Sequence, residues 1–438
     1  MAGPLVAWGW MVSTERGTAR RPPGRKAQLL GAAGELFHRR GYHQVSMAEV
    51  AAEVGITAPA LYRHFRGKPE LLRRVVDLEL SALHEAVLAG ADGPAALCAA
   101  LAAAAVDHRT LGTLWQRDAR LLPAAQRAEL RRALRADVQR MARVVGATRP
   151  ELAYGEAEFL SWSVLSVYGS LSHHTFAPPR RRFERLLRQL GTDVLALPSA
   201  DLPADLAAGL PADLPADGRD LRGGDPTTVQ LAAGATESRR EELLTAAVRL
   251  FHERGFDNVS TDQLGAAVGI AGPSVYKHFD SKSELLAAAL VRSRERLWHE
   301  VEGAIRAGTT PAGALSAGLR AYVGFAGHNV HYLGAMLSET DRLAEPDRKA
   351  ALDFRRDFLR TWVGLLQQLR PEYENAEARI RVHAMFALVN DGVRSRPGGA
   401  GPELTECLIA LGRAVLGTAD TTDAGTPRGA SHSGSPLG

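Results

Sequence analysis

The 438-residue chain has only two cysteines, few aromatic residues and no long uncharged apolar run. Cys98 and Cys407 cannot form a disulfide framework for so long a chain, which favours a reducing, cytoplasmic setting. Because no apolar run reaches the ~18 residues of a membrane-spanning helix, the sequence predicts no membrane partner. The apolar residues 1–12 have no basic segment before them and do not resemble a signal peptide; Met11 is an alternative start.

The sequence contains no recognisable set of catalytic residues. The sequence shows no nucleophile with a general base, no glycine-rich phosphate loop after a strand and no set of metal ligands. His173-His174 and the pair His328 and His331 lack the further Cys, His or Asp residues that would complete a metal site. The sequence therefore predicts no enzyme, no cofactor and no metal.

What is abundant is alanine and leucine at helical spacing, which predicts an all-α fold. The charge is uneven along the chain. Residues 1–197 hold 27 Lys and Arg against 18 Asp and Glu, whereas the remainder holds 26 against 31. A basic first half suits a polyanionic partner, although arginines on helix faces are also commonly just solvated.

A long block of sequence occurs twice. Residues 29–72 read LLGAAGELFHRRGYHQVSMAEVAAEVGITAPALYRHFRGKPELL, and residues 243–286 read LLTAAVRLFHERGFDNVSTDQLGAAVGIAGPSVYKHFDSKSELL. The blocks align without a gap at a constant offset of 214 positions, with about half of the residues identical. A repeat with so long a period indicates a duplicated domain, since solenoid repeats are about 20–50 residues long.

Each block contains the signals of a helix-turn-helix motif, at residues 46–65 and 260–279. Ser46 with Glu49, and Ser260 with Gln263, predict capping boxes at the start of the first helix. Gly55 and its counterpart Gly269 end that helix and allow a tight corner with positive φ. The second, recognition helices are predicted at 58–64 and 272–278, and a third start, with another capping box at 281–284, leads into a long helix.

Both blocks resemble the N-terminal domain of the TetR/AcrR family of transcriptional regulators. The resemblance rests on Phe37, Gly41, Ala51-Ala52, Val54-Gly55, Leu61 to Phe65, Lys68 and Glu70 to Leu72, and on their partners in the second block. It implies a double-stranded DNA operator and an unidentified small-molecule effector as partners, with repression as the family default. Activation stays an alternative, as does an architectural or partner-controlled DNA-binding protein without a ligand.

The resemblance also assigns DNA contacts. It implies phosphate contacts from Tyr62, Tyr276, Lys68 and Lys282, with His64 and His278 nearby; packing or idle surface positions are the alternatives for these residues. Base reading falls to small residues that suit a thymine methyl better than a bidentate hydrogen bond: Thr57, Ala58, Pro59 and Ala60, and Ala271, Gly272, Pro273 and Ser274. Arg63 and Lys277 are expected to contact either guanine or phosphate. Ser46, Ser260 and Thr261 are expected to contact the DNA backbone.

The rest of the chain divides around this repeat. The expected parts are a basic arm at 1–24, helix-turn-helix domains at 25–80 and 237–294, helical regulatory domains at 81–197 and 295–417, an acidic Pro-rich linker at 198–236 and a tail at 418–438. About 40 flexible linker residues reach roughly 35 Å, close to the spacing of half-sites on DNA. We therefore expect an intramolecular pseudo-dimer; a homo-oligomer of chains stays open.

The two regulatory halves offer weaker signals. The apolar stretches 157–176 with 183–197, and 380–393 with 404–416, are candidates for the surface through which the halves dimerise, or for ordinary core. Aromatic residues at helical spacing are candidates for a ligand pocket, although core packing is the more common use of such residues. These candidates are Trp115, Trp162, Tyr168, Tyr322, Tyr332 and Trp362.

Overall fold

The computed structural model describes residues 24–203, 206, 239–394 and 401–419, and these residues are helical with no strand. The all-α prediction is confirmed. The first half contains α1 (Arg25–Arg40), η1 (Tyr42–Gln44), α2 (Met47–Glu53), α3 (Ala58–Tyr62), α4 (Lys68–Ala89), α5 (Pro94–Asp107), α6 (Leu111–Thr113), η2 (Leu114–Asp118), η3 (Ala119–Leu121), α7 (Ala124–Thr148), α8 (Tyr154–Gly169), η4 (Ser170–His173), α9 (Arg180–Leu195) and η5 (Ser199–Asp201).

The second half repeats this order with small differences. It contains α10 (Arg239–Arg254), η7 (Phe256–Asn258), α11 (Thr261–Ala267), η8 (Gly272–Lys277), α12 (Lys282–Ala307), α13 (Pro311–His328), α14 (Val330–Ser338), η9 (Thr340–Arg342), α15 (Glu345–Leu369), α16 (Asn375–Arg394) and α17 (Pro402–Leu416). In the first half, η2 is a single π-helical turn, a geometry that is often found at functional sites.

The predicted helix starts are largely as the sequence indicates. Ser46 and Ser260 each accept a hydrogen bond from the third residue of the helix, and Glu49 and Gln263 complete the two capping boxes. At Ser281 only half of the predicted box forms. Its side chain caps α12, but the Glu284 carboxylate accepts a hydrogen bond from the backbone N–H of Asp280 instead.

The two recognition segments differ in helix type. The first is a short α-helix, α3, whereas the second, η8, is a 3₁₀-helix that ends one residue before the predicted His278. The residues explain the difference, since Ala58 and Ala60 are replaced by Gly272 and Ser274, which favour the α-helix less. A Cβ atom at Gly272 would lie 1.9 Å from Asp262 Oδ1, so only glycine lets η8 approach α11 this closely.

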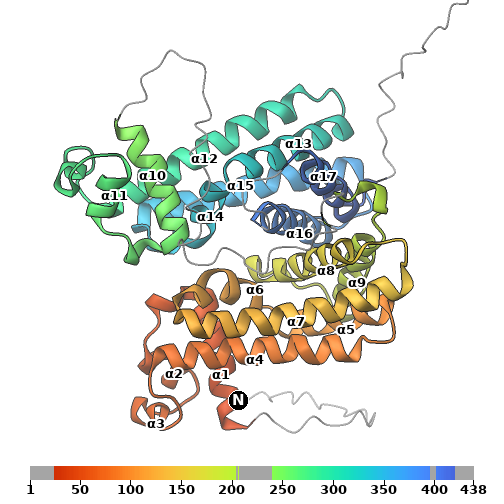
Figure 1. Cartoon of the computed structure of the whole chain (residues 1–438), viewed down its shortest axis with the longest axis horizontal. Helices are drawn as coiled ribbons and strands as arrows, with labels where there is room; N and C mark the ends of the chain where they lie inside the picture. The colour runs from red at the N-terminus through yellow and green to blue at the C-terminus, as the bar shows by residue number, and fades with distance from the viewer. Residues whose placement is uncertain (1–23, 204–205, 207–238, 395–400, 420–438) are drawn as a thin grey trace, which may run out of the picture.

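The two halves pack against each other through their last helices, α8 on α16 and α9 on α17 (Figure 1). One apolar core runs through both halves and includes Val164 and Leu190 from the first half with Leu388 and Leu411 from the second, while the second helix-turn-helix unit has a separate core around Phe251 and Phe279. The apolar stretches that the sequence marks as interface or core are thus part of one continuous intramolecular interface.

Several predicted segments lie partly outside the described residues: the arm 1–24, the linker 198–236 and the tail 418–438. The first residues of the linker are folded, since Ser199–Asp201 form η5 and both Leu202 and Leu206 are buried. The linker prediction therefore begins too early. Within the described part of the chain, no helix is long and apolar enough to cross a membrane.

Candidate nucleic-acid interface and central cavity

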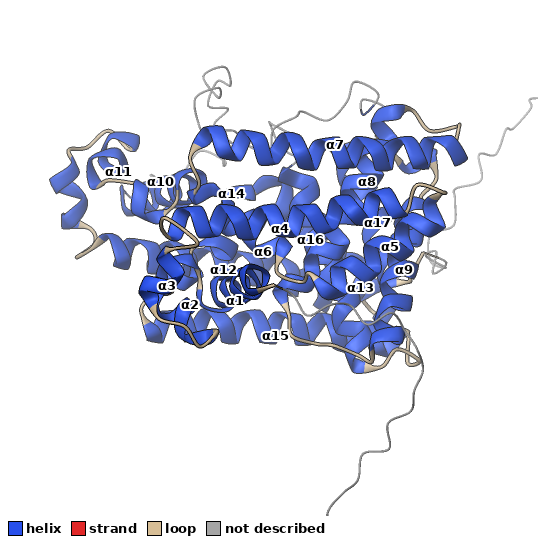
Figure 2. Ribbon diagram, turned by 90° about the horizontal axis from the view of Figure 1, so that it is seen from below, coloured by secondary structure: helices blue, strands red, loops and turns tan. Residues whose placement is uncertain are grey.

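The two helix-turn-helix units lie at the same end of the molecule, with α2 and α3 near one corner and α11 near the other (Figure 2). The turns have the backbone that the sequence predicts, with φ of +68° at Gly55 and +72° at Gly269. Each recognition segment is held by one buried apolar side chain, Leu61 in α3 and Val275 in η8, and Gly272 of η8 is buried as well. Their remaining side chains are thereby available at the surface.

Tyr62 and Tyr276 project from the recognition segments into solvent. They are 53% and 52% exposed, which is unusual for a large aromatic side chain. Since neither ring is needed for the core, the alternative that they are packing residues does not hold. Arg63 and Lys277 beside them are exposed as well, as is His64, whereas His278 is half-buried.

Among the residues expected to read bases, Thr57, Pro59, Ala271 and Pro273 are exposed, and Ala58, Ala60 and Ser274 are half-buried. Gly272 is the exception. It is buried against Asp262 of α11, and its close approach to that helix is the physical reason; its contact with DNA bases stays a prediction.

Lys68 and Lys282 bind the turns that precede each motif. Lys282 Nζ donates hydrogen bonds to the carbonyl oxygens of Phe256 and Val259 at 2.9 and 3.0 Å, and Lys68 Nζ donates to the His43 carbonyl at 3.4 Å. Each ammonium also lies 4.3 Å from an aromatic ring, that of Tyr42 or Phe256. Partial burial lowers the pKa of both lysines. They hold the fold of the unit, so a phosphate contact has to use the remaining N–H donors.

The residues predicted to contact the DNA backbone lie at the capped N-terminal ends of α2 and α11. Ser46 and Ser260 are exposed at the first turns of α2 and α11, but their hydroxyls already accept hydrogen bonds from the helix. Thr261 is half-buried beside Ser260. The backbone N–H groups of Ser46 and Ser260 are also used, since they donate to the side chains of Glu49 and Gln263.

A charged junction of Arg117, Arg120, Glu339 and Asp341 joins the two halves beside the helix-turn-helix units. Arg117 pairs with Asp341 at 2.9 Å and also donates to the carbonyl of Phe37, the end of α1. Arg120 pairs at 2.6 Å with Glu339, whose side chain is 1% exposed and accepts from the Phe256 backbone N–H. Residues of each half therefore bind the other half next to its DNA-binding unit.

A cavity of about 810 Å³ lies behind this junction and extends between the halves. Its size is within the range of small-molecule sites. The apolar part is formed by Leu83, Leu101, Leu134 and Phe159 of the first half. Trp115, Trp162 and Tyr168, the ligand-pocket candidates of the first half, also line it.

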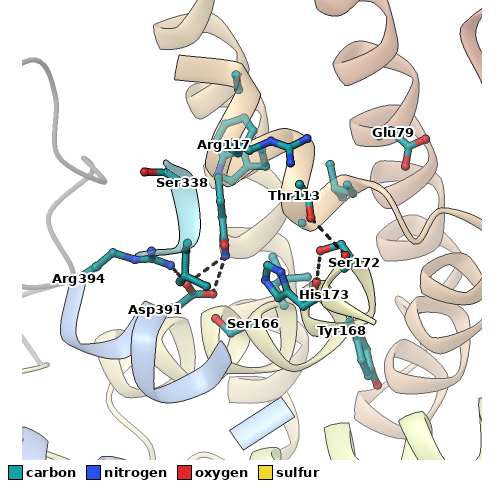
Figure 3. Close-up of a pocket in the computed structure, with 18 of the residues that line it drawn as sticks. Glu79, Thr113, Arg117, Ser166, Tyr168, Ser172, His173, Ser338, Asp391 and Arg394 are labelled. Atoms are coloured by element: carbon teal, nitrogen blue, oxygen red, sulfur yellow. Dashed lines mark hydrogen bonds and ion pairs between the residues drawn. The ribbon is translucent and has the colours of Figure 1, made fainter. Parts of the chain in front are cut away.

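The polar wall comes from both halves and shows a short hydrogen-bonded chain (Figure 3). Gln116 of the π-helical turn donates to Asp391 of α16 at 3.1 Å, and Asp391 pairs with Arg394. Thr113 donates to the carbonyl of Ser172 at 3.3 Å. All of these residues line the cavity. The contact between Gln116 and Asp391 joins the two halves, whereas the pair of Asp391 with Arg394 lies within the second half.

Half-buried histidines line the same region and are held neutral. Burial lowers the pKa of His38 to about 4 and the pKa of His173 and His252 to about 3, with nearby arginines adding to the effect. A neutral imidazole both donates and accepts a hydrogen bond, which suits a polar ligand. No group of three or more His, Cys, Asp or Glu residues with metal-binding geometry occurs in the described ranges.

The three aromatic candidates of the second half lie elsewhere. Tyr322 and Trp362 are fully packed in an aromatic cluster with Phe358 and Phe386, and the Tyr322 hydroxyl donates to Asn390 at 2.9 Å. Tyr332 contacts the Arg296 guanidinium instead. None of the three lines the central cavity, because the interior of the second half is filled by these rings.

Sequence reasoning missed the junction and the π-helical turn. A weak signal was present, since Arg120-Leu121 and Arg342-Leu343 repeat the same dipeptide in the two halves. No pattern in the sequence pairs Arg120 with Glu339, because their positions are 219 apart and they meet only when the halves pack.

Comparison with known proteins places both units in one group. The family described as "Bacterial regulatory proteins, tetR family" matches residues 29–75 and 243–289, once in each half. The chain is 33% identical over 110 residues to the HTH-type transcriptional activator FasR of Mycolicibacterium smegmatis, covering 25% of this chain and 50% of FasR. It is 42% identical over 62 residues to the HTH-type transcriptional repressor BdcR of Escherichia coli, covering 13% and 32%.

The chain thus spans half or less of the length of these curated relatives. Among solved structures, the ketosteroid transcriptional regulator KstR2 of Mycobacterium tuberculosis is 25% identical, with a TM-score of 0.37 over 42% of this chain and 96% of that one.

Proposed function

Because the chain belongs, through both of its helix-turn-helix units, to the tetR family of bacterial regulatory proteins, we propose that it is a DNA-binding transcriptional regulator that acts as a ligand-responsive repressor. The observation that carries the proposal is the pair Tyr62 and Tyr276. Both are half-exposed at equivalent positions of two recognition segments, which lie at the same end of the folded molecule.

The two units are proposed to bind one operator as a single-chain pseudo-dimer. The packing of α8 and α9 on α16 and α17, and the junction between Arg120 and Glu339, support this proposal because they fix the spacing of the units without a second chain. The recognition segments differ in sequence and in helix type, so the two half-sites are expected to be related but unequal. A larger homo-oligomer is compatible with the same surfaces.

Control by a small molecule is proposed from the position of the cavity. Arg117, Arg120 and Asp341 belong both to the junction and to the cavity lining. A ligand that prefers one arrangement of these residues would change the spacing of the units, to an extent set by its differential affinity for the two arrangements. The cavity favours this function over an architectural DNA-binding protein without a ligand.

The test is to replace Tyr62 and Tyr276 by Ala, singly and together, and to measure DNA binding at several salt concentrations. Each single variant is expected to weaken binding about tenfold for all sequences, because a phosphate contact positions without specifying, and to leave the salt dependence unchanged, because the tyrosine hydroxyl carries no charge and releases no counterions. Tyr154→Ala, at another exposed tyrosine outside both units, is the matched control. Unchanged binding by both single variants would contradict the proposal that both units bind DNA.

A further inference from the structure

Glu79 of α4 is a buried carboxylate of the cavity lining that no described arginine or lysine pairs with (Figure 3). Its side chain is 10% exposed, and its Oε2 atom has no hydrogen-bond partner among the described residues. The other oxygen, Oε1, lies 3.5 Å from His108 Nδ1, at the long end of the hydrogen-bond range. A buried carboxylate in this state is costly, and the group that it lacks is a hydrogen-bond donor.

The other polar groups of the lining have less need of a ligand. Asp341 and Asp391 are each paired with an arginine, and Glu253 is exposed. Buried nitrogens of His38 and His174 also lack a partner, but burial lowers the pKa of these two rings to about 4 and about 2, so both are neutral. An unpartnered charge costs more free energy than an unpartnered neutral group.

The walls around this carboxylate are largely apolar. Leu83 lies one helical turn after Glu79 on α4, and Leu101 and Ala105 of α5 and Phe159 of α8 line the same cavity. Ligand sites in proteins commonly combine such an apolar lining with a few polar groups that fix the orientation of the ligand. The first half therefore offers an apolar space with one buried acceptor on its wall.

The described part of the second half has no equivalent site. At the offset of 214 positions, Ser293 of α12 takes the place of Glu79, and its hydroxyl donates to the Ala289 carbonyl at 2.7 Å. Helices α5 and α13 both begin at a proline, and counted from there Tyr322 takes the place of Ala105. The Tyr322 ring belongs to the aromatic cluster that fills this half. The described residues therefore form one such site in each chain.

The charges of the lining select among hydrogen-bond donors. Arg109 and Arg131 line the same cavity and repel an ammonium ion, whereas Glu79 repels a carboxylate. A neutral hydroxyl donates to the Glu79 carboxylate without either repulsion. The donor that suits this site best is thus the hydroxyl group of an alcohol or a phenol.

We propose that the central cavity binds one neutral, apolar molecule per chain that carries a hydroxyl group, and that this hydroxyl donates a hydrogen bond to the Glu79 carboxylate. The proposal deepens the proposed function and rests on it for the regulatory consequence alone. Binding itself can be measured without DNA.

The test is equilibrium dialysis of the full-length chain against β-naphthol and its methyl ether, which share an apolar body and differ in the donor. β-Naphthol is expected to bind at one per chain and at least about tenfold more tightly than the ether, since a hydrogen bond to a charged group contributes this much. Glu79→Leu should remove the preference while leaving binding of the ether in place. Glu85→Leu, at an exposed position on α4, is the matched control.

Glu79→Gln keeps the shape of the side chain and serves if the leucine variant does not fold. Its preference for β-naphthol should fall to about threefold, because a neutral acceptor forms a hydrogen bond about half as strong. Equal affinities of the unchanged chain for the two probes, a full preference in the Glu79 variants, or two naphthols per chain would overturn the inference. Tighter binding of β-naphthylmethylammonium than of β-naphthol would also overturn it, since the ligand would then be a cation.

DNA binding is measured separately on the same samples. Absence of the naphthol preference with intact DNA binding refutes this inference only. Absence of DNA binding with an intact preference refutes the proposed regulator and leaves the ligand site in place.

Discussion

Lys282 illustrates how one residue type can serve a fold and a partner at once. Family resemblance assigns it to the DNA backbone, whereas its ammonium donates to two backbone carbonyls of the turn before the motif. The same arrangement, with a longer distance, occurs at Lys68. We interpret the two lysines as residues that fix the start of the long helix relative to the recognition segment. Their remaining N–H donors are left for a DNA phosphate.

Replacing Lys282 with Met is expected to lower the free energy of unfolding by about 1–3 kcal/mol, because two buried carbonyls lose their donor. Lys277→Met, at an exposed position in the same unit, should leave stability unchanged and weaken DNA binding only. Chemical denaturation of both variants measures the difference. Equal stabilities would mean that Lys282 is a surface residue after all.

At the scale of the element, the sequence predicts where helices begin better than which kind of helix forms. The capping boxes at Ser46 and Ser260 are local, involving residues three apart, and both are confirmed. The 3₁₀ geometry of η8 depends on how closely it packs on α11, where Gly272 lies against Asp262, and no local pattern in the sequence predicts that contact. The charged junction and the aromatic cluster also could not be predicted from the sequence, because both bring together residues that are distant in sequence.

Replacing Gly272 with Ala is expected to destabilise the second unit by about 1–3 kcal/mol, because the new methyl group overlaps Asp262 Oδ1 and lies close to the backbone. The reciprocal change at the first unit, Ala58→Gly, should cost about 1 kcal/mol or less and by a different mechanism, the loss of helix propensity. Thermal unfolding and footprinting of both variants separate the two effects. Full stability and an unaltered second half-site in Gly272→Ala would refute the packing argument.

The whole molecule is a covalent arrangement of two similar halves, and partly buried histidines lie where the halves meet. His173 of η4 and His252 of α10 line the cavity, and the His383 ring of α16 lies 4.9 Å from that of His174. Burial lowers the pKa of His173, His252 and His383 to about 3. The folded chain therefore resists protonation at positions where the unfolded chain accepts protons near pH 6.5.

Stability is accordingly expected to fall as the pH is lowered from about 7 toward 4. In this range the unfolded state binds more protons than the folded state, so acidification favours unfolding. The melting temperature should decrease by several degrees per pH unit, and His173→Gln should reduce the slope. His299→Gln, at an exposed position on α12, is the control. A melting temperature that is flat between pH 7.5 and 5.5 would contradict the assignment of these imidazoles as neutral.

The contact of α8 and α9 with α16 and α17 has a consequence for gene dosage. Separate subunits must first find each other, so the abundance of an active dimer varies with the square of subunit abundance when subunits are scarce. Here the partner surface is encoded in the same reading frame, and the abundance of the paired form varies only in proportion to synthesis. In the proposed single-chain pseudo-dimer, a few copies of this chain per cell would thus already hold paired DNA-binding units, and exchange with related subunits would not dilute them.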